Sequence, residues 1–241
     1  MKKLPLLLIA LPFFFGCSKE EVKPAMSIKN DDITLFRESA ETLIVENNPG
    51  DMLFESQNKL IASVSDEGVV EGGVRGETTV MVTSLGEVAV AKVVVNTIIN
   101  YIPEPYLGFG ENIETVKSKV NYDEDFIEMD DGFAVTRKID KTDVVYVYGF
   151  EDGRLNMSFF MFKTLSNITS VITDFLLERY VPVSLTGAYS AGFISPEKDM
   201  AVLLSASDNK DYIYVGYMKY DGEAEAMARA LKTLTLHSIP Q

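Results

Sequence analysis

The sequence predicts an all-β sandwich followed by an α+β domain, and three observations lead to this assignment. Residues 28–96 are short runs of alternating apolar and polar residues broken by turn residues, which is typical of a sandwich. Residues 98–110 hold two prolines and two glycines, a composition typical of a stiffened linker. Residues 111–241 mix helical and alternating patterns, which favours an antiparallel sheet with helices on one face.

The first domain is predicted at residues 27–97 and contains seven candidate strands. Each is a short run rich in β-branched or aromatic residues. Asn47-Asn48-Pro49-Gly50 is a strong chain breaker between the second and third candidates. The candidates are 33–36, 41–46, 51–55, 60–65, 69–70, 78–83 and 88–95.

The second domain, residues 111–241, carries a weak internal repeat. The segment 112–116 returns as 167–171, and each begins with an asparagine that can cap a helix. Apolar residues at helical spacing form one stripe on the second helix: Ile168, Val171, Ile172, Phe175 and Leu176. Strand candidates follow each helix, so we predict two αβββ-like units. The candidates are 126–128 with 133–139, 144–150 and 155–162, then 185–194, 201–206 and 212–218, before a last helix at 223–234.

Residues 1–16 have the pattern of a secretory signal peptide. Lys2 and Lys3 precede an apolar run at 4–15, which is too short to span a bilayer as a helix, where ~20 residues are needed. Gly16 and the only cysteine, Cys17, end the run, as a lipoprotein signal peptidase requires. The alternative is a soluble export signal with an incidental cysteine.

Phe14-Phe15-Gly16-Cys17 resembles a relaxed lipobox, which implies acylation of Cys17 and a tether over residues 17–26. Several acyl chains would anchor the protein firmly in a membrane without a spanning helix. The triplet Lys19-Glu20-Glu21 resembles the lipoprotein export signal of Bacteroidetes-type bacteria, which implies the outer face of the outer membrane. The alternative is a plain charged tether.

One family resemblance covers about 70 residues of the first domain. Residues 61–72, IASVSDEGVVEG, and 76–82, GETTVMV, resemble the bacterial immunoglobulin-like group 2 domain. This implies an immunoglobulin-like sandwich that serves as a spacer or adhesion module and has no catalytic residues. Phe54 stands where the family has a Trp, so we expect it in the core.

The charge balance excludes one class of partner. The formal charge is −14, and removal of residues 1–16 takes away two lysines and no acids, which leaves −16. Such an acidic domain repels phosphate backbones, so no nucleic-acid partner is expected. With Cys17 acylated, no cysteine remains for a disulfide.

The sequence predicts no catalytic residue, metal or cofactor. The only histidine, His237, lies close to the C-terminus, and one histidine without a free cysteine disfavours a zinc site. The acidic groups Asp123-Glu124-Asp125 and Asp130-Asp131 lack the spacing of a calcium loop. Solvated turns explain them better.

Tyrosine is the residue type most suggestive of binding. Tyr146, Tyr148 and Tyr220 are the candidate ligand contacts, because aromatic side chains on an open sheet suit a glycan or a protein. The alternative is core packing. Alignment of the two repeats places Tyr212 and Tyr214 on the helix-covered face.

We therefore expect a surface-exposed outer-membrane lipoprotein that acts as a non-catalytic binding or adhesion module with an immunoglobulin-like spacer. One alternative is a carboxylate-based enzyme such as a glycoside hydrolase, using acids such as Asp123 and Glu128. The absence of tryptophan disfavours it, since such enzymes usually line deep clefts with that residue. A structural component of a surface assembly is the other alternative.

Overall fold

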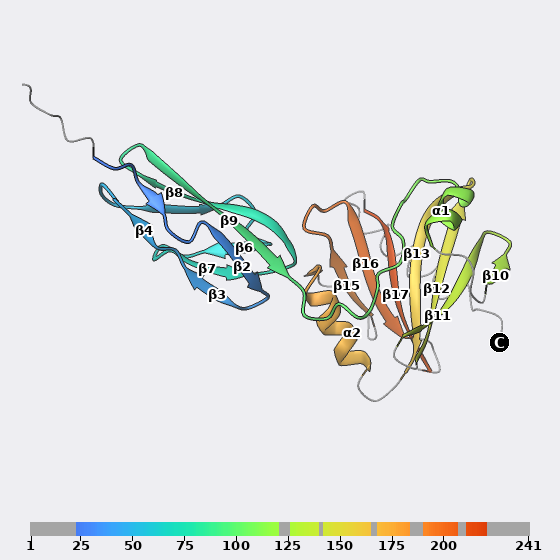
Figure 1. Ribbon diagram of the computed structural model, residues 1–241. Coiled ribbons are helices and arrows are strands. Elements are labelled where there is room, and N and C mark those ends of the chain that lie inside the picture. Colours follow the sequence, from blue (N-terminus) through green and yellow to red (C-terminus); the bar gives the residue numbers. More distant parts are fainter. Residues whose placement is uncertain are drawn as a thin grey trace, which may run out of the picture.

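The computed structural model describes residues 23–120, 126–139, 142–164, 168–183, 190–206 and 211–220. The chain is mostly β, with sandwich-like sheets and two short helices among these residues. It forms an N-terminal lobe (residues 23–97) and a C-terminal lobe (residues 98–220), which lie end to end (Figure 1). Separate clusters of buried apolar side chains form the core of each lobe.

Two facing sheets form the N-terminal lobe, together with a short pair of strands. The first sheet has the order β2 (Asp32–Phe36), β9 (Glu87–Asn96), β8 (Gly76–Ser84), β5 (Leu53–Ser56). The second has the order β3 (Ala40–Thr42), β7 (Val69–Gly72), β6 (Ala62–Val64), and β1 (Ser27–Ile28) pairs with β4 (Val45–Glu46). All seven predicted segments contain strands. The prediction missed the two-residue β1, and the segment 41–46, predicted as one strand, contains two, β3 and β4, which belong to different sheets.

Alternation of side chains explains this packing. Along β8 and β9, every second residue is buried between the sheets, among them Val80, Val82, Ala91 and Val93. Phe54 does not fill an interior position as expected: it is half-buried and packs over Gly68. A Cβ atom at Gly68 would lie 2.9 Å from the Phe54 ring. Truncation of Phe54 should therefore cost less than the ~3–5 kcal/mol of a fully buried phenylalanine.

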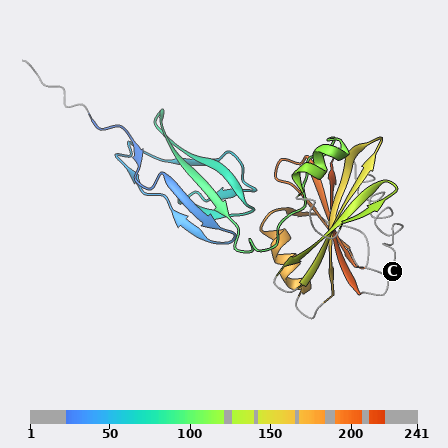
Figure 2. The same cartoon turned by 45° about the vertical axis from the view of Figure 1, so that its right-hand side comes forward.

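The C-terminal lobe is one antiparallel sheet with the order β10-β11-β12-β13-β17-β16-β15-β14, and Figure 2 shows its strands fanning out with the twist. Helix α1 (Ile113–Lys119) precedes β10 (Phe126–Met129), β11 (Gly132–Ile139), β12 (Thr142–Glu151) and β13 (Arg154–Lys163). Helix α2 (Ile168–Leu177) precedes β14 (Val181–Val183), β15 (Ser190–Ile194), β16 (Met200–Ala206) and β17 (Tyr212–Lys219). The predicted repeat thus has four strands in each unit rather than three, and the units meet where β13 pairs with β17.

Both helices cover the same face of this sheet. The predicted stripe of α2 is confirmed: Ile172, Phe175 and Leu176 are buried in the core, with Ile168 and Val171 packed against it. The Asn112 side chain caps α1 as predicted, accepting a hydrogen bond of 2.9 Å from the Thr115 amide. Asn167 and the last predicted helix at 223–234 lie outside the described residues.

The segment 98–110 is not the bare linker that its prolines predicted. Ile102 is buried in the core of the C-terminal lobe. The hydroxyl of Tyr146 donates to the Pro103 carbonyl at 2.9 Å, and that of Ser158 donates to the Tyr106 carbonyl at 2.7 Å. This segment therefore belongs to the C-terminal lobe, and a fragment designed to fold alone should include it.

A β-bulge explains why the repeat alignment put Tyr212 and Tyr214 on the wrong face. Gly149 pairs with Met157 and the next residue, Phe150, pairs with Leu155, so Asn156 is an extra residue in β13. An extra residue shifts the following side chains to the opposite face. Tyr214 packs with the cluster on the face away from the helices, and Tyr217 lies in the helix-covered core instead.

Candidate functional site

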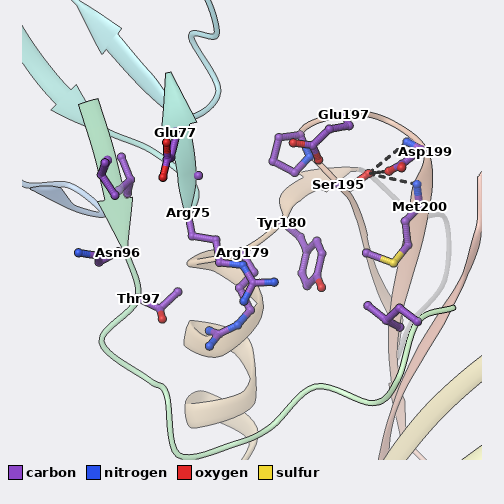
Figure 3. Close-up of a pocket in the computed structure, with 15 residues that line it drawn as sticks. Arg75, Glu77, Asn96, Thr97, Arg179, Tyr180, Ser195, Glu197, Asp199 and Met200 are labelled. Carbon is purple, nitrogen blue, oxygen red and sulfur yellow. Dashed lines mark hydrogen bonds between the residues drawn. The ribbon is translucent and has the colours of Figure 1, made fainter. Parts of the chain in front are cut away.

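A pocket of about 550 Å³ lies between the two lobes (Figure 3). The N-terminal lobe contributes the start of β8 and the end of β9. The C-terminal lobe contributes the residues after α2 and the turn between β15 and β16. Its volume is in the range of small-ligand sites, which is ~300–1,000 Å³. The lining side chains include Arg75, Glu77, Thr97, Leu107, Arg179, Tyr180, Ser195 and Glu197.

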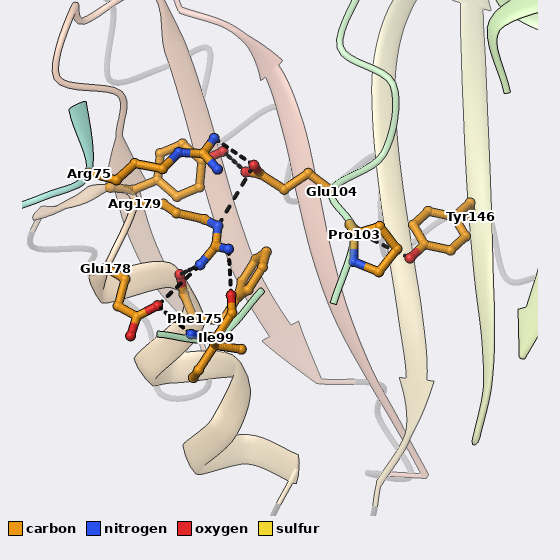
Figure 4. Close-up of polar contacts among 9 residues, drawn as sticks. Arg75, Ile99, Pro103, Glu104, Tyr146, Phe175, Glu178 and Arg179 are labelled. Atoms are coloured by element: carbon orange, nitrogen blue, oxygen red, sulfur yellow. Dashed lines mark hydrogen bonds and ion pairs between the residues drawn. The ribbon is translucent and has the colours of Figure 1, made fainter. Parts of the chain in front are cut away.

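A network of charged residues joins the lobes beside this pocket (Figure 4). Glu104 lies at its centre, in the segment that the sequence assigned to a linker. Its carboxylate is 2.6 Å from the guanidinium of Arg75 and 3.7 Å from Nε of Arg179. It also accepts a short hydrogen bond from the Tyr180 hydroxyl. One carboxylate thus connects an arginine of the N-terminal lobe with two residues that follow α2.

Arg179 is the most deeply buried charge of the network, with a side chain that is 4% exposed. It donates to the Phe175 carbonyl at 3.0 Å and to the Ile99 carbonyl at 2.6 Å. Its guanidinium also lies 3.8 Å from the centroid of the Phe175 ring. These contacts fix the end of α2 against the segment that leaves β9.

Glu178 ties the same two segments to the N-terminal lobe through backbone groups. Its carboxylate accepts hydrogen bonds from the amides of Ile98 and Ile99, at 3.2 and 3.0 Å. Its backbone carbonyl accepts a bond of 2.7 Å from the Arg75 amide. The bond from the Arg75 amide and the ion pair between Arg75 and Glu104 thus cross from one lobe to the other, and we infer that the lobes keep a fixed orientation.

Burial sets the protonation behaviour of this junction. It lowers the pKa of the Arg179 guanidinium, although the nearby Glu104 carboxylate opposes the shift. It raises the pKa of the Tyr180 and Tyr217 phenols well above 10, and the Glu104 charge raises both further. The Tyr217 hydroxyl is buried and makes no hydrogen bond to the described residues.

From the raised pKa values of Tyr180 and Tyr217 we predict that the protein loses stability at high pH. Below pH ~10 both phenols keep their protons in the folded and unfolded states, so their full contribution to the free energy of unfolding is present. Above pH ~10 the unfolded chain ionises while the folded phenols stay neutral. The free energy of unfolding should then fall by about 1.4 kcal/mol per pH unit for each phenol.

Urea unfolding at a series of pH values from neutral upwards measures this slope. Tyr217→Phe should remove the contribution of one phenol from this slope. It should cost little at pH 7, since the Tyr217 hydroxyl makes no hydrogen bond to the part of the chain that the structure describes. Tyr101→Phe is the control, because Tyr101 is exposed. An unchanged slope in Tyr217→Phe would refute the assignment.

Ser195 of the pocket lining has an aliphatic hydroxyl beside a carboxylate, as a serine nucleophile would. It donates to Oδ1 of Asp199 at 2.7 Å and accepts from the amides of Asp199 and Met200, both at 3.1 Å. All of these bonds lie within the turn between β15 and β16, and no lining residue is a histidine that would serve as base. The hydroxyl holds the turn.

The tyrosines predicted to contact a ligand do not line this pocket. Tyr146 and Tyr148 are buried in the core beneath the segment 98–110. The Tyr148 hydroxyl accepts a bond of 3.3 Å from the Tyr106 amide. Both side chains lie on the helix-covered face of β12 and are only 2% and 3% exposed, so they do not present a surface to a ligand in this structure. Tyr220 is partly buried against the opposite face, and its amide donates to the Asp199 carbonyl at 2.8 Å.

The remaining predicted residues fall into two groups. Glu128 is exposed and forms an ion pair of 3.3 Å with Lys117, which is the environment of a surface charge. Outside the described residues lie Cys17, Lys19, Glu20, Glu21, Asp123 and His237. Within the described part of the chain, no group of three or more His, Cys, Asp or Glu is placed to hold a metal ion.

Sequence reasoning missed Arg75, Glu104 and Arg179. Each belongs to a different segment, and only the fold brings them together. One signal was present: Glu178-Arg179 directly follows an apolar helix, and Glu104 lies between two prolines in an otherwise apolar stretch. Isolated charges in apolar surroundings are often paired.

Comparison with known proteins adds little to these observations. No family model and no curated protein matches the chain. Among solved structures, domains 5–6 of the S-layer protein SbsC match over 83% of this chain and 86% of that chain, with 15% identity and a TM-score of 0.25. A similarity of this size carries no argument about fold or function.

Proposed function

We propose that this protein is a lipid-anchored surface lipoprotein that acts as a non-catalytic binding module. The N-terminal lobe serves as an immunoglobulin-like spacer, and the junction pocket with the C-terminal lobe receives the ligand. The observation that carries the proposal is the contact of Arg75 with Glu104 and with the Glu178 carbonyl, which closes the junction beside a pocket of about 550 Å³.

A fixed orientation of the two lobes is consistent with the N-terminal lobe serving as a spacer. Domains joined by a small polar interface usually move relative to one another. Here Arg75 of the N-terminal lobe holds the C-terminal lobe at two points: its guanidinium is 2.6 Å from the Glu104 carboxylate, and its amide donates to the Glu178 carbonyl at 2.7 Å. A pocket formed by two lobes of fixed orientation keeps its shape without a ligand, which lowers the entropic cost of binding. This arrangement favours recognition over a chemical reaction.

The pocket lining favours a polar ligand such as a sugar residue or a charged peptide side chain. Arg75 offers a partly exposed guanidinium on one wall, and Glu197 offers an exposed carboxylate on another. The backbone at the ends of β8 and β9 adds hydrogen-bonding groups at its edge. A glycan or a protein of the host or neighbouring cell surface is the class of ligand that we propose.

Filling the pocket tests the proposal. The purified chain from Cys17 onward would be screened on a glycan array and against cell-surface proteins. Glu197→Trp should abolish the binding that the parent shows, because the indole would occupy the pocket mouth. The matched control is Glu67→Trp, an exposed glutamate in a turn of the N-terminal lobe. Equal binding by both variants would place the ligand elsewhere.

A further inference from the structure

The tip of the β8–β9 hairpin carries an apolar residue that the fold does not need. Ser84 pairs with Glu87, so Leu85 and Gly86 form a two-residue turn. Both have positive φ, 46° for Leu85 and 89° for Gly86, and Leu85 is 80% exposed. A branched side chain is disfavoured at positive φ, and here no burial compensates for it.

A second hairpin of the same chain has residues that are usual in a two-residue turn with positive φ. Glu151 pairs with Arg154, and the turn between them is Asp152-Gly153, with φ of 51° and 70°. Asp-Gly is a preferred pair for this turn, whereas Leu-Gly is not. The leucine at the tip of β8–β9 therefore points to a role outside the fold.

Leu85 continues into a row of exposed apolar side chains on the outer face of the first sheet. Leu53 pairs with Thr83, and Thr83 pairs with Val88, so the three residues form one cross-strand row. Leu53 is 63% exposed and Val88 is 57% exposed. Leu85 also lies against Gly50, at the end of the loop before β5. We define Leu53, Leu85 and Val88 as the tip patch.

The chain enters the lobe at this same end. The Met26 amide donates to the Glu87 carboxylate at 2.7 Å, and the Asn47 side chain donates to the Ala25 carbonyl at 3.3 Å. Figure 1 shows the first described residues beside the β8–β9 hairpin, at the end of the molecule away from the C-terminal lobe. Nine residue-to-residue steps separate Cys17 from Met26, and they span at most ~30 Å when extended.

We propose that the tip patch contacts the lipid bilayer beside the anchor. This inference rests on the lipid anchor of the proposed function, and the occupant is the interfacial region of the membrane. A tether of this length keeps the patch within reach of the surface, and leucine and valine gain free energy by leaving water for the acyl boundary. The contact would orient the N-terminal lobe with the C-terminal lobe pointing away from the membrane.

The chain contains no tryptophan and one cysteine, which makes a direct test possible. The chain from Cys17 onward would be coupled through Cys17 to a maleimide lipid in phosphatidylcholine vesicles, and Leu85→Trp would serve as the reporter. On coupling, its emission should shift to shorter wavelength, and nitroxide-labelled lipid should quench it. Ile98→Trp is the control, since Ile98 is 67% exposed and lies at the junction of the lobes, away from the tip patch. Its emission should not change.

Emission from Leu85→Trp that is unchanged by coupling would overturn the proposal. A concentration-dependent shift without vesicles would also overturn it, because it would show that a second copy covers the patch. Melting curves of the free chains confirm that the variants fold. A second reporter, Val88→Trp, should lose its quenching when Leu85→Asn is added, although this change should raise the melting temperature. Chemical coupling does not depend on acylation in cells, so failure of this test and failure of the anchor assignment are distinguishable.

Discussion

Arg179→Met should destabilise the protein by ~3–5 kcal/mol, the cost of removing one partner from a buried ion pair. The variant leaves Glu178 without its cation and removes the donors to the Phe175 and Ile99 carbonyls. Water cannot replace the lost guanidinium as their hydrogen-bond partner, because these groups lie inside the closed junction. Glu104 keeps Arg75, so the loss should fall mainly on the segments around α2.

Urea unfolding of the full chain measures this effect, and the chain offers a matched control. Arg37 forms an exposed ion pair of 3.1 Å with its neighbour Glu38. Such surface pairs contribute about 0–1 kcal/mol, so Arg37→Met should change stability little. The double variant Arg179→Met/Glu104→Gln should cost less than the sum of its single changes, because the two residues interact. If Arg179→Met lowered the free energy of unfolding no more than Arg37→Met does, the contacts of Arg179 would not stabilise the fold as we infer.

Cys17→Ser should remove the protein from the membrane fraction of the cell. The cysteine thiol is the only group that a lipoprotein signal offers for acylation, and the chain contains no other cysteine. Without acyl chains the remaining residues offer no firm attachment, since the tip patch is small. The measurement is metabolic labelling with a fatty-acid analogue, followed by fractionation. Lys19→Ala keeps the thiol and should stay labelled, whereas label that persists in Cys17→Ser would contradict the assignment.

The sequence allowed the local elements to be predicted because they depend on short-range patterns. The alternation in β8 and β9 identifies strands with one buried face, and the apolar stripe of α2 identifies a helix packed on a sheet. The cap at Asn112 was readable for the same reason. Each of these patterns is complete within about a dozen residues.

Features that depend on tertiary contacts could not be predicted in this way. The bulge at Asn156 shifts the faces of β13, and no residue pattern marked its position. The prolines of the segment 98–110 were consistent with a linker, yet Ile102 and Glu104 pack into the C-terminal lobe and the junction. The pocket is formed by segments far apart in the chain, so sequence motifs could not identify the residues that line it.

Surface presentation is the central claim of this account, and protease digestion of intact cells tests it most directly. The parent would be compared with a variant in which Lys19, Glu20 and Glu21 are all replaced by alanine. We predict that both are acylated to the same degree, that the parent is digested from outside, and that the variant is protected until the cells are opened. Equal digestion of parent and variant would show that the triplet is only a tether, and protection of both would contradict a surface-exposed binding module.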